Sequence, residues 1–298
     1  MAWVPQVRAE GGGAAPYLRA GAGARGVGMG GAQTAAADDA SAAYWNPGKL
    51  PFLAGDRVLA QTSVLGWERA WNFLGFTHAD VNATGGSYAY AGTWINFSAG
   101  SDLEAREENR PLPDHMFSDS ENALLLSLAS GLGPGLGVGS NLKLLLQSLD
   151  GTSASGFGLD LAVWHQLDPD WSWGLMLQDV YSSLNWPGGY QDRVPWLIRA
   201  GVMYQLGDTG LRASCDADAE YLHAPAAVRN YRYHAGVEYQ ALPALAVRTG
   251  LDNGRWTAGA SGNFRLGERV TLQLDYALAT ERMPGEGLNH VFSLAVSW

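Results

Sequence analysis

The sequence predicts an all-β protein, a transmembrane up-and-down β-barrel of about fourteen antiparallel strands, preceded by an N-terminal segment of different composition. Three observations lead to this fold class. From Arg57 onward, apolar and other residues alternate in blocks of about ten, with turn residues between the blocks. The last block is amphipathic and stops on Trp298, the final residue. Charged residues make up only 16% of the chain, whereas a soluble globular protein carries about 25%.

The composition excludes several other classes of protein. The formal net charge is -10, and no stripe of Lys and Arg is present that could neutralise the phosphates of a nucleic acid. A membrane-spanning helix needs about 18 apolar residues, and the nearest run, Ala123 to Ala129, is far too short. Cys215 is the only cysteine, which excludes an intramolecular disulfide and a multi-cysteine zinc site. We expect its thiol to face lipid as a small apolar group.

The chain divides into three parts by composition. Residues 1–9 resemble the tail of an export signal, because Val7 and Ala9 stand at the third and first positions before a signal-peptidase cut. An ordinary flexible N-terminus accounts for these residues equally well. Residues 10–51 are rich in Gly and Ala and lack a sustained period, and residues 52–298 carry the alternating blocks of the predicted barrel.

The block from Leu211 to Tyr221 illustrates the alternation. Apolar or small residues occupy its odd positions, and the even positions hold Arg212, Ser214, Asp216, Asp218 and Glu220. The blocks over residues 231–239 and 270–278 alternate in the same way. In a barrel of this kind, the polar face of each strand lines the lumen and the apolar face meets lipid.

Connection lengths favour a membrane barrel over a soluble sandwich, which would also alternate. Every second connection is a short turn, as at residues 132–135, 167–170, 206–210, 241–244 and 266–268. The others are often longer, as at residues 100–119, 182–192 and 281–289. Short turns on one rim and longer loops on the other are typical of outer-membrane barrels, and an even strand count places both chain ends at the periplasmic rim.

The final strand resembles the signal that directs barrel assembly in the outer membrane. Its outward face carries His290 and the residues that we expect to form that signal, which are Phe292, Leu294, Val296 and Trp298. Aromatic residues also gather near block ends, as interfacial girdles do: Trp171, Trp173, Trp186, Trp196 and Trp256.

Two motifs of the N-terminal segment resemble the opening of the PorV/PorQ family, relatives of the FadL fatty-acid transporters. The first is a Gly-Met-Gly-Gly-Ala run that includes Met29, Gly30 and Gly31. The second is an acidic stretch from Asp38 and Asp39 that continues to Trp45, Asn46 and Pro47. The family continues with Ala-Gly-Leu, whereas residues 48–50 are Gly-Lys-Leu, a mild departure that leaves the turn plausible. Residues 153–161 and the final hairpin are also similar.

The resemblance implies a fourteen-stranded barrel with residues 10–51 as a plug in the periplasmic end of the lumen. Small residues suit that place, because they let a chain fold tightly inside a barrel. Asp38, Asp39 and Ser41 are candidates to cap a short helix. Asn46 would end it, since the residue before a proline is pushed out of the helical region.

Motifs of enzymes and cofactor sites are present only by chance. Residues 21–26 fit the G-x-G-x-x-G pattern, but no apolar strand precedes them as a dinucleotide site requires. Ser140 and Lys143 fit S-x-x-K, yet in a strand they point to opposite faces. The six histidines lack metal-ligand spacing, although His234 is expected to face the lumen. We therefore expect no enzyme activity, no metal and no cofactor.

Inward-facing charges form a candidate lumen-facing ionic network. Its members are Lys143, Asp160, Arg199, Arg212, Asp216, Asp218, Glu220, Arg232, Glu238, Arg248, Arg265 and Asp275. These charges either form a polar path for a substrate or fill a narrow lumen with paired ions. The second interpretation is favoured, because isolated buried charges are costly.

Two functions remain open, and neither is enzymatic. As in PorV/PorQ proteins, the resemblance implies a docking or structural subunit of an envelope complex in type IX secretion. The alternative is FadL-like passive transport of hydrophobic small molecules, which needs an apolar pocket near the N-terminal segment and a bulge or gap in an early strand. The expected partners are outer-membrane lipid, lipopolysaccharide, other envelope or secreted proteins and a hydrophobic small molecule, but no nucleic acid.

Overall fold

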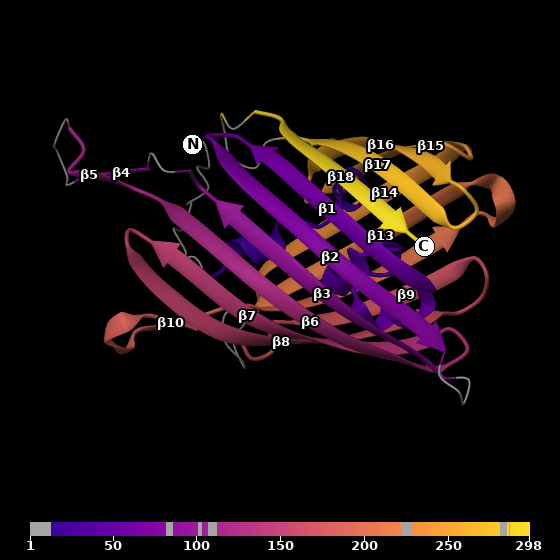
Figure 1. Ribbon diagram of the computed structural model, residues 1–298, viewed down its shortest axis with the longest axis horizontal. Coiled ribbons are helices and arrows are strands. Elements are labelled where there is room, and N and C mark those ends of the chain that lie inside the picture. Colours follow the sequence, from indigo (N-terminus) through magenta and orange to yellow (C-terminus); the bar gives the residue numbers. More distant parts are fainter. Residues whose placement is uncertain are drawn as a thin grey trace, which may run out of the picture.

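The computed structural model describes residues 13–81, 86–100, 103–106, 112–221, 228–280, 285 and 287–298. The predicted signal remnant at residues 1–9 lies outside these residues. Among the helices in the described ranges, none is long and apolar enough to cross a membrane. The chain forms one closed antiparallel barrel that surrounds the N-terminal segment (Figure 1).

The barrel contains sixteen strand segments that make fourteen barrel strands. In chain order, these segments are β1 (Gly55–Leu65), β2 (Arg69–Val81), β3 (Ser87–Ser98), β6 (Asp119–Gly133), β7 (Leu136–Leu149), β8 (Thr152–Gln166), β9 (Trp171–Gln178), β10 (Ser183–Asn185), β11 (Gln191–Arg193), β12 (Trp196–Gln205), β13 (Leu211–Tyr221), β14 (Val228–Leu242), β15 (Leu245–Asp252), β16 (Arg255–Leu266), β17 (Val270–Ala279) and β18 (Asn289–Ser297). The short strands β4 (Leu103–Ala105) and β5 (His115–Phe117) pair separately. The predicted all-β barrel of about fourteen strands is confirmed.

The first and last strands close the barrel. β1 pairs with β18 in antiparallel register from Arg57 opposite Ser297 to Val64 opposite His290. The backbone of Trp298 continues this pairing, since its N–H donates to Asp56 O at 3.0 Å and its carbonyl accepts from Asp56 N at 3.1 Å. Every barrel strand therefore has a neighbour on both edges, as a backbone in lipid requires.

One barrel strand is interrupted by a bulge. β9 and β10 both pair with β8, and β11 and β12 continue the next strand in the same way. Leu161 pairs with Leu177 and Phe157 with Ser183, so three residues of β8 face five of the neighbouring strand. Asp179, in this bulge, has the left-handed φ of 57° that Asp tolerates better than most residues. The predicted connection over residues 182–192 is therefore wrong in part, because β10 and β11 extend the wall there.

Side chains alternate between lumen and lipid along each strand. On β6, Ala123 and Leu125 are buried in the lumen, whereas Leu124 and Leu126 are exposed on the outside. Cys215 is exposed on the outer face of β13. The outward residues of β18 include Phe292, Leu294, Val296 and Trp298. The alternation that predicted the strands therefore also separates their two faces as expected.

The two rims differ in their connections. The rim that carries Gly55 and Trp298, here called the terminal rim, has short turns at residues 134–135, 167–170, 206–210, 243–244 and 267–269. The opposite rim, here called the distal rim, carries the β4–β5 excursion and the β10–β11 hairpin (Figure 1). The predicted asymmetry of connection lengths agrees with this arrangement.

The N-terminal segment lies inside the barrel and is called the plug from here on (residues 13–54). It contains η1 (Pro16–Arg19), α1 (Ala24–Gly28), α2 (Ala42–Trp45) and η2 (Pro47–Phe52). Glycines on the wall let its backbone approach. A Cβ on Gly236 would lie 2.3 Å from Met29 O, and one on Gly250 would lie 2.4 Å from Gly30 N. A Cβ on Gly30 itself would lie 2.5 Å from Leu251 O, and its φ of 68° is also one that glycine adopts most easily.

The short helix α2 differs in one detail from the prediction. It begins after Ser41, but the hydroxyl of Ser41 makes no capping hydrogen bond. Instead, the carboxylate of Asp39 accepts a hydrogen bond from Ser41 N at 2.7 Å. Asn46 ends the helix with extended backbone angles, and its side chain accepts a hydrogen bond from Gly48 N that begins η2. Proline at the first position of η2 fits, because its missing N–H is not needed there.

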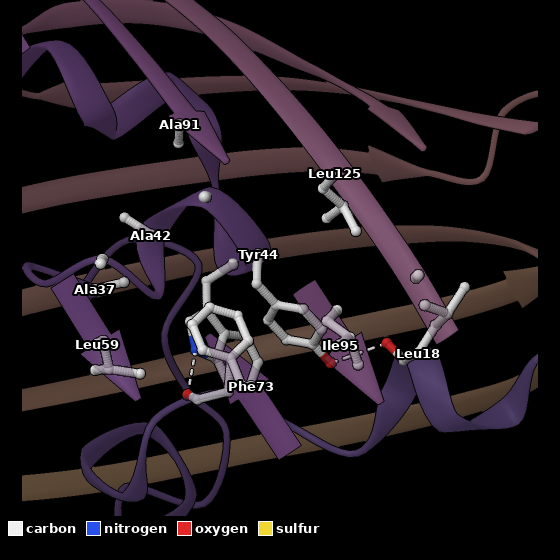
Figure 2. Packing of buried hydrophobic residues seen from close by; sticks show 14 of the residues in the cluster. Leu18, Ala37, Ala42, Tyr44, Leu59, Phe73, Ala91, Ile95 and Leu125 are labelled. Atoms are coloured by element: carbon white, nitrogen blue, oxygen red, sulfur yellow. Dashed lines mark hydrogen bonds between the residues drawn. The ribbon is translucent and has the colours of Figure 1, made fainter. Parts of the chain in front are cut away.

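Apolar packing holds one flank of the plug. Figure 2 shows Tyr44 among side chains from neighbouring strands, including Phe73 and Ile95. The Tyr44 hydroxyl donates to Leu18 O at 2.9 Å, so the polar end of this buried ring is satisfied. The indole N–H of Trp45 donates to Ala22 O at 2.8 Å. These bonds fix the plug's own fold while its surface packs against the wall.

A row of polar side chains runs across the outer face of β1, β2, β3 and β6, and we call it the outer polar row. Thr62 donates to Asn72 at 2.9 Å, Asn72 to Asn96 at 3.1 Å, and Asn96 to Asn122 at 3.2 Å. These residues are direct cross-strand neighbours. The row lies near the distal ends of the four strands.

Candidate functional site

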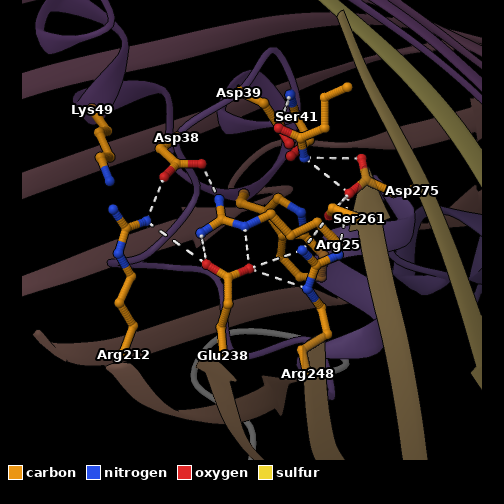
Figure 3. A network of polar contacts seen from close by, with 12 residues as sticks. Arg25, Asp38, Asp39, Ser41, Lys49, Arg212, Glu238, Arg248, Ser261 and Asp275 are labelled. Atoms are coloured by element: carbon orange, nitrogen blue, oxygen red, sulfur yellow. Dashed lines mark hydrogen bonds and ion pairs between the residues drawn. The ribbon is translucent and has the colours of Figure 1, made fainter. Parts of the chain in front are cut away.

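A cluster of ion pairs around Glu238 joins α1 of the plug to the barrel wall (Figure 3). Arg25 approaches Glu238 with both Nε and Nη2, at 2.7 and 2.8 Å. Arg248 lies 3.1 Å from the same carboxylate and 3.2 Å from Asp275. Arg25 also pairs with Asp38. Because Arg25 and Glu238 are buried and bidentate, this pair fixes the orientation of α1 as well as its position.

Asp38 extends this cluster toward the terminal rim. Its second carboxylate oxygen lies 2.8 Å from Nη1 of Arg212, on β13. Arg212 lies 3.8 Å from Glu238. The acidic motif of the N-terminal segment thus has a structural partner on the wall, and Asp39 instead serves the turn before α2.

A second cluster forms at the bulge. Lys143 lies 2.7 Å from Asp160 and 2.8 Å from Asp179. Arg19 of the plug reaches the other oxygen of Asp179 at 2.7 Å. All four charged groups are almost entirely buried. The bulge therefore aims Asp179 into the lumen, where its carboxylate joins a wall lysine to a plug arginine.

A third cluster centres on Asp218. Arg199 binds it with two hydrogen bonds of 2.8 and 3.0 Å, and His234 Nε2 lies 3.3 Å from it. His234 Nδ1 lies 2.8 Å from Gly30 O, so the ring bridges the wall and the plug. Arg232 lies more loosely near Asp218 and Glu220, at 3.8 and 3.7 Å.

Asp216 holds the plug backbone directly. Its Oδ2 accepts hydrogen bonds from Gln33 N at 2.9 Å, Thr34 N at 2.8 Å and the Thr34 hydroxyl at 2.6 Å. Successive free backbone N–H groups are usually capped by a side chain of their own segment. Here the carboxylate of Asp216, on the wall, takes the place of such a cap.

The structure brings together nearly all the predicted network residues, but not Arg265. Arg265 is exposed near the terminal rim and forms no ion pair with any described residue. The plug motif residues Trp45 and Asn46 are buried among backbone groups. The amide of Asn46 donates to Thr34 O at 2.9 Å and to Val163 O at 3.0 Å. Arg19, Arg25 and Asp179 were not among the predicted site residues, although two arginines in a Gly/Ala-rich lumen segment require counter-charges.

Lys49 is a cation of the plug that lacks a carboxylate partner among the described residues. Its Nζ lies 3.4 Å from Ala35 O and 5.2 Å from the centre of the Trp164 ring. Burial, together with the nearby Arg25 and Arg212, lowers the pKa of Lys49 to about 7. Its charge is thus marginal at neutral pH, unlike that of the paired arginines.

A cavity of about 570 Å³ lies between the plug and the distal rim. Its floor includes Tyr17, Arg19, Val27 and Trp45 of the plug. One wall is apolar and the other is charged. The apolar wall includes Leu65, Trp71, Phe97 and Val291, and the charged wall includes Arg199, Arg232, His234, Asp252 and Arg255. Its size lies within the range of about 300–1,000 Å³ that small-molecule sites occupy.

Candidate metal ligands are not grouped in the described part of the chain. No group of three or more His, Cys, Asp or Glu side chains is placed to hold a metal ion there. Lys143 is fully engaged by two carboxylates, and Ser140 lies on the opposite face of β7. The arrangement can bind, exclude or pass a molecule.

No protein-family model matches the chain, and no curated protein matches its sequence. Solved structures do match over nearly the whole chain. The toluene transporter TbuX of Ralstonia pickettii aligns with a TM-score of 0.68 and 15% identity, over 93% of this chain and 98% of that one. The toluene transporter TodX of P. putida gives 0.69 and 13%, over 93% and 99%. The chain has the FadL-type barrel fold.

A FadL homologue of Pseudomonas aeruginosa agrees, with a TM-score of 0.63 and 10% identity over 92% of this chain and 97% of that one. At such identities the likeness concerns the fold. It supports a barrel fold of the kind found in these transporters. None of these three structures is a PorV or PorQ protein.

Proposed function

We propose that the protein is a passive outer-membrane channel for hydrophobic small molecules. The observation that carries this proposal is the cavity on the plug, whose wall of Leu65, Trp71 and Phe97 offers apolar contact to a ligand. The structures named above include two toluene transporters, which supports the same substrate class. The proposal also assigns the distal rim to the extracellular side and both chain ends to the periplasm.

This function requires an apolar pocket near the N-terminal segment and a bulge or gap in an early strand. The structure has the pocket, but its two-residue bulge lies in a later strand. An apolar pocket does lie next to the N-terminal segment. The two-residue bulge lies at Asp179 in the β9–β10 strand, which is the seventh barrel strand. Among the early strands, β6 has a register shift between Gly131 and Gly133, at the terminal rim. Arg19, which lines the cavity, contacts Asp179, so the bulge and the cavity are adjacent.

Filling the cavity tests the proposal. Ala279 lines the cavity from β17, and its neighbour Leu278 lies on the outer face. We expect Ala279→Trp to reduce toluene uptake into proteoliposomes by roughly tenfold, the factor for 1.4 kcal/mol of lost binding. Leu278→Trp is the matched control and should leave uptake unchanged. Uptake by the native protein no faster than by empty liposomes would refute the channel.

A docking or structural subunit of an envelope complex, as in PorV/PorQ proteins of type IX secretion, is the second candidate. The ion pairs that join the plug to Asp179, Glu238 and Arg212 of the wall favour it, because docking needs no passage through the lumen. This function predicts that the native protein copurifies with a secreted or envelope protein and takes up no toluene. Toluene uptake without any such partner would exclude it.

A further inference from the structure

Glu121 is a buried carboxylic acid side chain in the apolar wall of the cavity. It lies on β6, is only 4% exposed, and lines the cavity. Phe97 on β3 is its direct cross-strand neighbour, and Trp71 on β2 is the neighbour of Phe97. Trp71, Phe97 and Glu121 therefore form one inward row across three adjacent strands.

The Glu121 carboxyl group has no partner in the described part of the chain. None of its contacts there is a hydrogen bond or an ion pair, and its Oε2 atom is buried without a donor. Other charges of the cavity are paired: Arg19 with Asp179, Arg199 with Asp218, and Arg255 with Asp252. A polar group buried without a hydrogen bond is destabilising, so an unpartnered carboxyl group at this place points to a ligand.

The surroundings of Glu121 define the chemistry of that ligand. Rings of Trp71 and Phe97 beside the carboxyl group suit an aromatic molecule. A carboxyl group accepts a hydrogen bond and, when protonated, also donates one, and a ligand group that both donates and accepts matches it in either state. The cavity lining contains five arginines against two carboxylates, which disfavours a cationic donor such as an amine. A neutral hydroxyl group remains.

We propose that the cavity selects hydroxylated aromatic molecules over the corresponding hydrocarbons, with Glu121 accepting the hydrogen bond of the hydroxyl group. This inference rests on the proposed channel function and names its substrate class. A site with an unsatisfied polar group discriminates strongly against a ligand that lacks the matching group. Toluene and p-cresol differ by that one hydroxyl group, and both are small enough for the cavity.

Tryptophan fluorescence titrations of the purified protein in detergent test the inference, because Trp45 and Trp71 line the cavity. We expect the native protein to bind p-cresol about tenfold more tightly than toluene, which corresponds to about 1.4 kcal/mol. Glu121→Leu should remove this preference and leave toluene binding intact. Glu121→Gln should keep most of it, since an amide oxygen also accepts a hydrogen bond.

Asp119→Leu is the matched control, because Asp119 lies on β6 two residues nearer the distal rim and outside the cavity lining. It should keep the preference for p-cresol. Toluene binding without preference, or a preference that survives in Glu121→Leu, would overturn this inference alone. Tighter binding of 4-methylbenzylamine than of p-cresol would also overturn it. Failure of the native protein to bind either aromatic compound would overturn the channel function as well.

Discussion

The two sides of the lumen hold the same plug by different interactions. On the apolar side, formed by β1, β2, β3 and β6, buried residues such as Trp71, Phe73 and Ile95 pack against the plug (Figure 2). On the ionic side, formed by β12 to β17, carboxylates and guanidinium groups join it at defined distances (Figure 3). Asp179 and Lys143 stand between the two sides.

The two kinds of interaction have different effects on the plug: apolar packing holds it in the lumen, and ion pairs fix its orientation. Burial of apolar surface is roughly proportional to area and has no preferred direction, so it stabilises many similar positions of the plug. Bidentate ion pairs impose distances and angles, so the pair of Arg25 with Glu238 selects one position of the plug. We infer that the apolar side supplies most of the stability and that the ionic side supplies the register.

The largest effect is expected from breaking the ionic side. Glu238→Ala leaves Arg25 and Arg248 without their shared carboxylate. Removal of one partner of a buried pair costs about 3–5 kcal/mol. Urea unfolding in detergent micelles should show a loss of this size. The plug of the variant should also become accessible to protease, because its register is no longer fixed.

Arg265→Gln serves as the control for that variant, since Arg265 is exposed and outside the network. Its effect on the free energy of unfolding should stay within about 0.5 kcal/mol. A Glu238→Ala protein as stable as this control, with an equally protease-resistant plug, would show that the ion pairs contribute neither stability nor register.

A somewhat smaller effect is expected on the apolar side. Ile95→Ala removes a side chain that is fully buried in the cluster around Tyr44. The cost should be about 3 kcal/mol, within the range for such truncations. Unlike Glu238→Ala, this variant should keep a protease-resistant plug. Cleavage of its plug at the rate found for Glu238→Ala would contradict the division of roles.

The smallest effect comes from Lys49, a cation in η2 that packs near the apolar side. Its pKa in the folded protein is lowered to about 7, below the unfolded value of about 10.4. The unfolded chain therefore binds more protons, and stability rises with pH between these values. We expect a gain of roughly 1 kcal/mol from pH 7 to pH 8. Lys49→Met should unfold at the same urea concentration at both pH values. If the variant shows the same pH dependence as the native protein, another group causes that dependence.

Much of the wall could be predicted from the sequence, because period-two alternation specifies which face each residue occupies. Asp216, Asp218 and Glu238 fall on the lumen face for that reason alone. The β9–β10 strand was harder to predict, because a bulge of two residues interrupts the period-two alternation at the place where Asp179 turns inward. The region around β10 and β11 therefore resembled a loop.

The hydrogen-bond partners of side chains could not be predicted as well as the strand face on which each side chain lies. The sequence places Asp216 in the lumen, but its acceptance of hydrogen bonds from Gln33 and Thr34 depends on how the plug folds. The plug has no periodicity, because its segments are short and held by the wall around them. Glu121 was not predicted as a site residue, because its place in the apolar wall of the cavity is a property of three neighbouring strands.

The outer polar row has a consequence for the surrounding bilayer. On the outer face of β2, Leu74 and Phe76 separate Asn72 from the His78–Asp56 pair. Six residues at about 3.3 Å each, tilted by about 40°, span roughly 15 Å of membrane thickness. Barrels usually present an apolar band of about 25 Å. In the proposed outer-membrane location, the apolar band beside β2 is thus thinner than usual, and local thinning of the bilayer would relieve this hydrophobic mismatch.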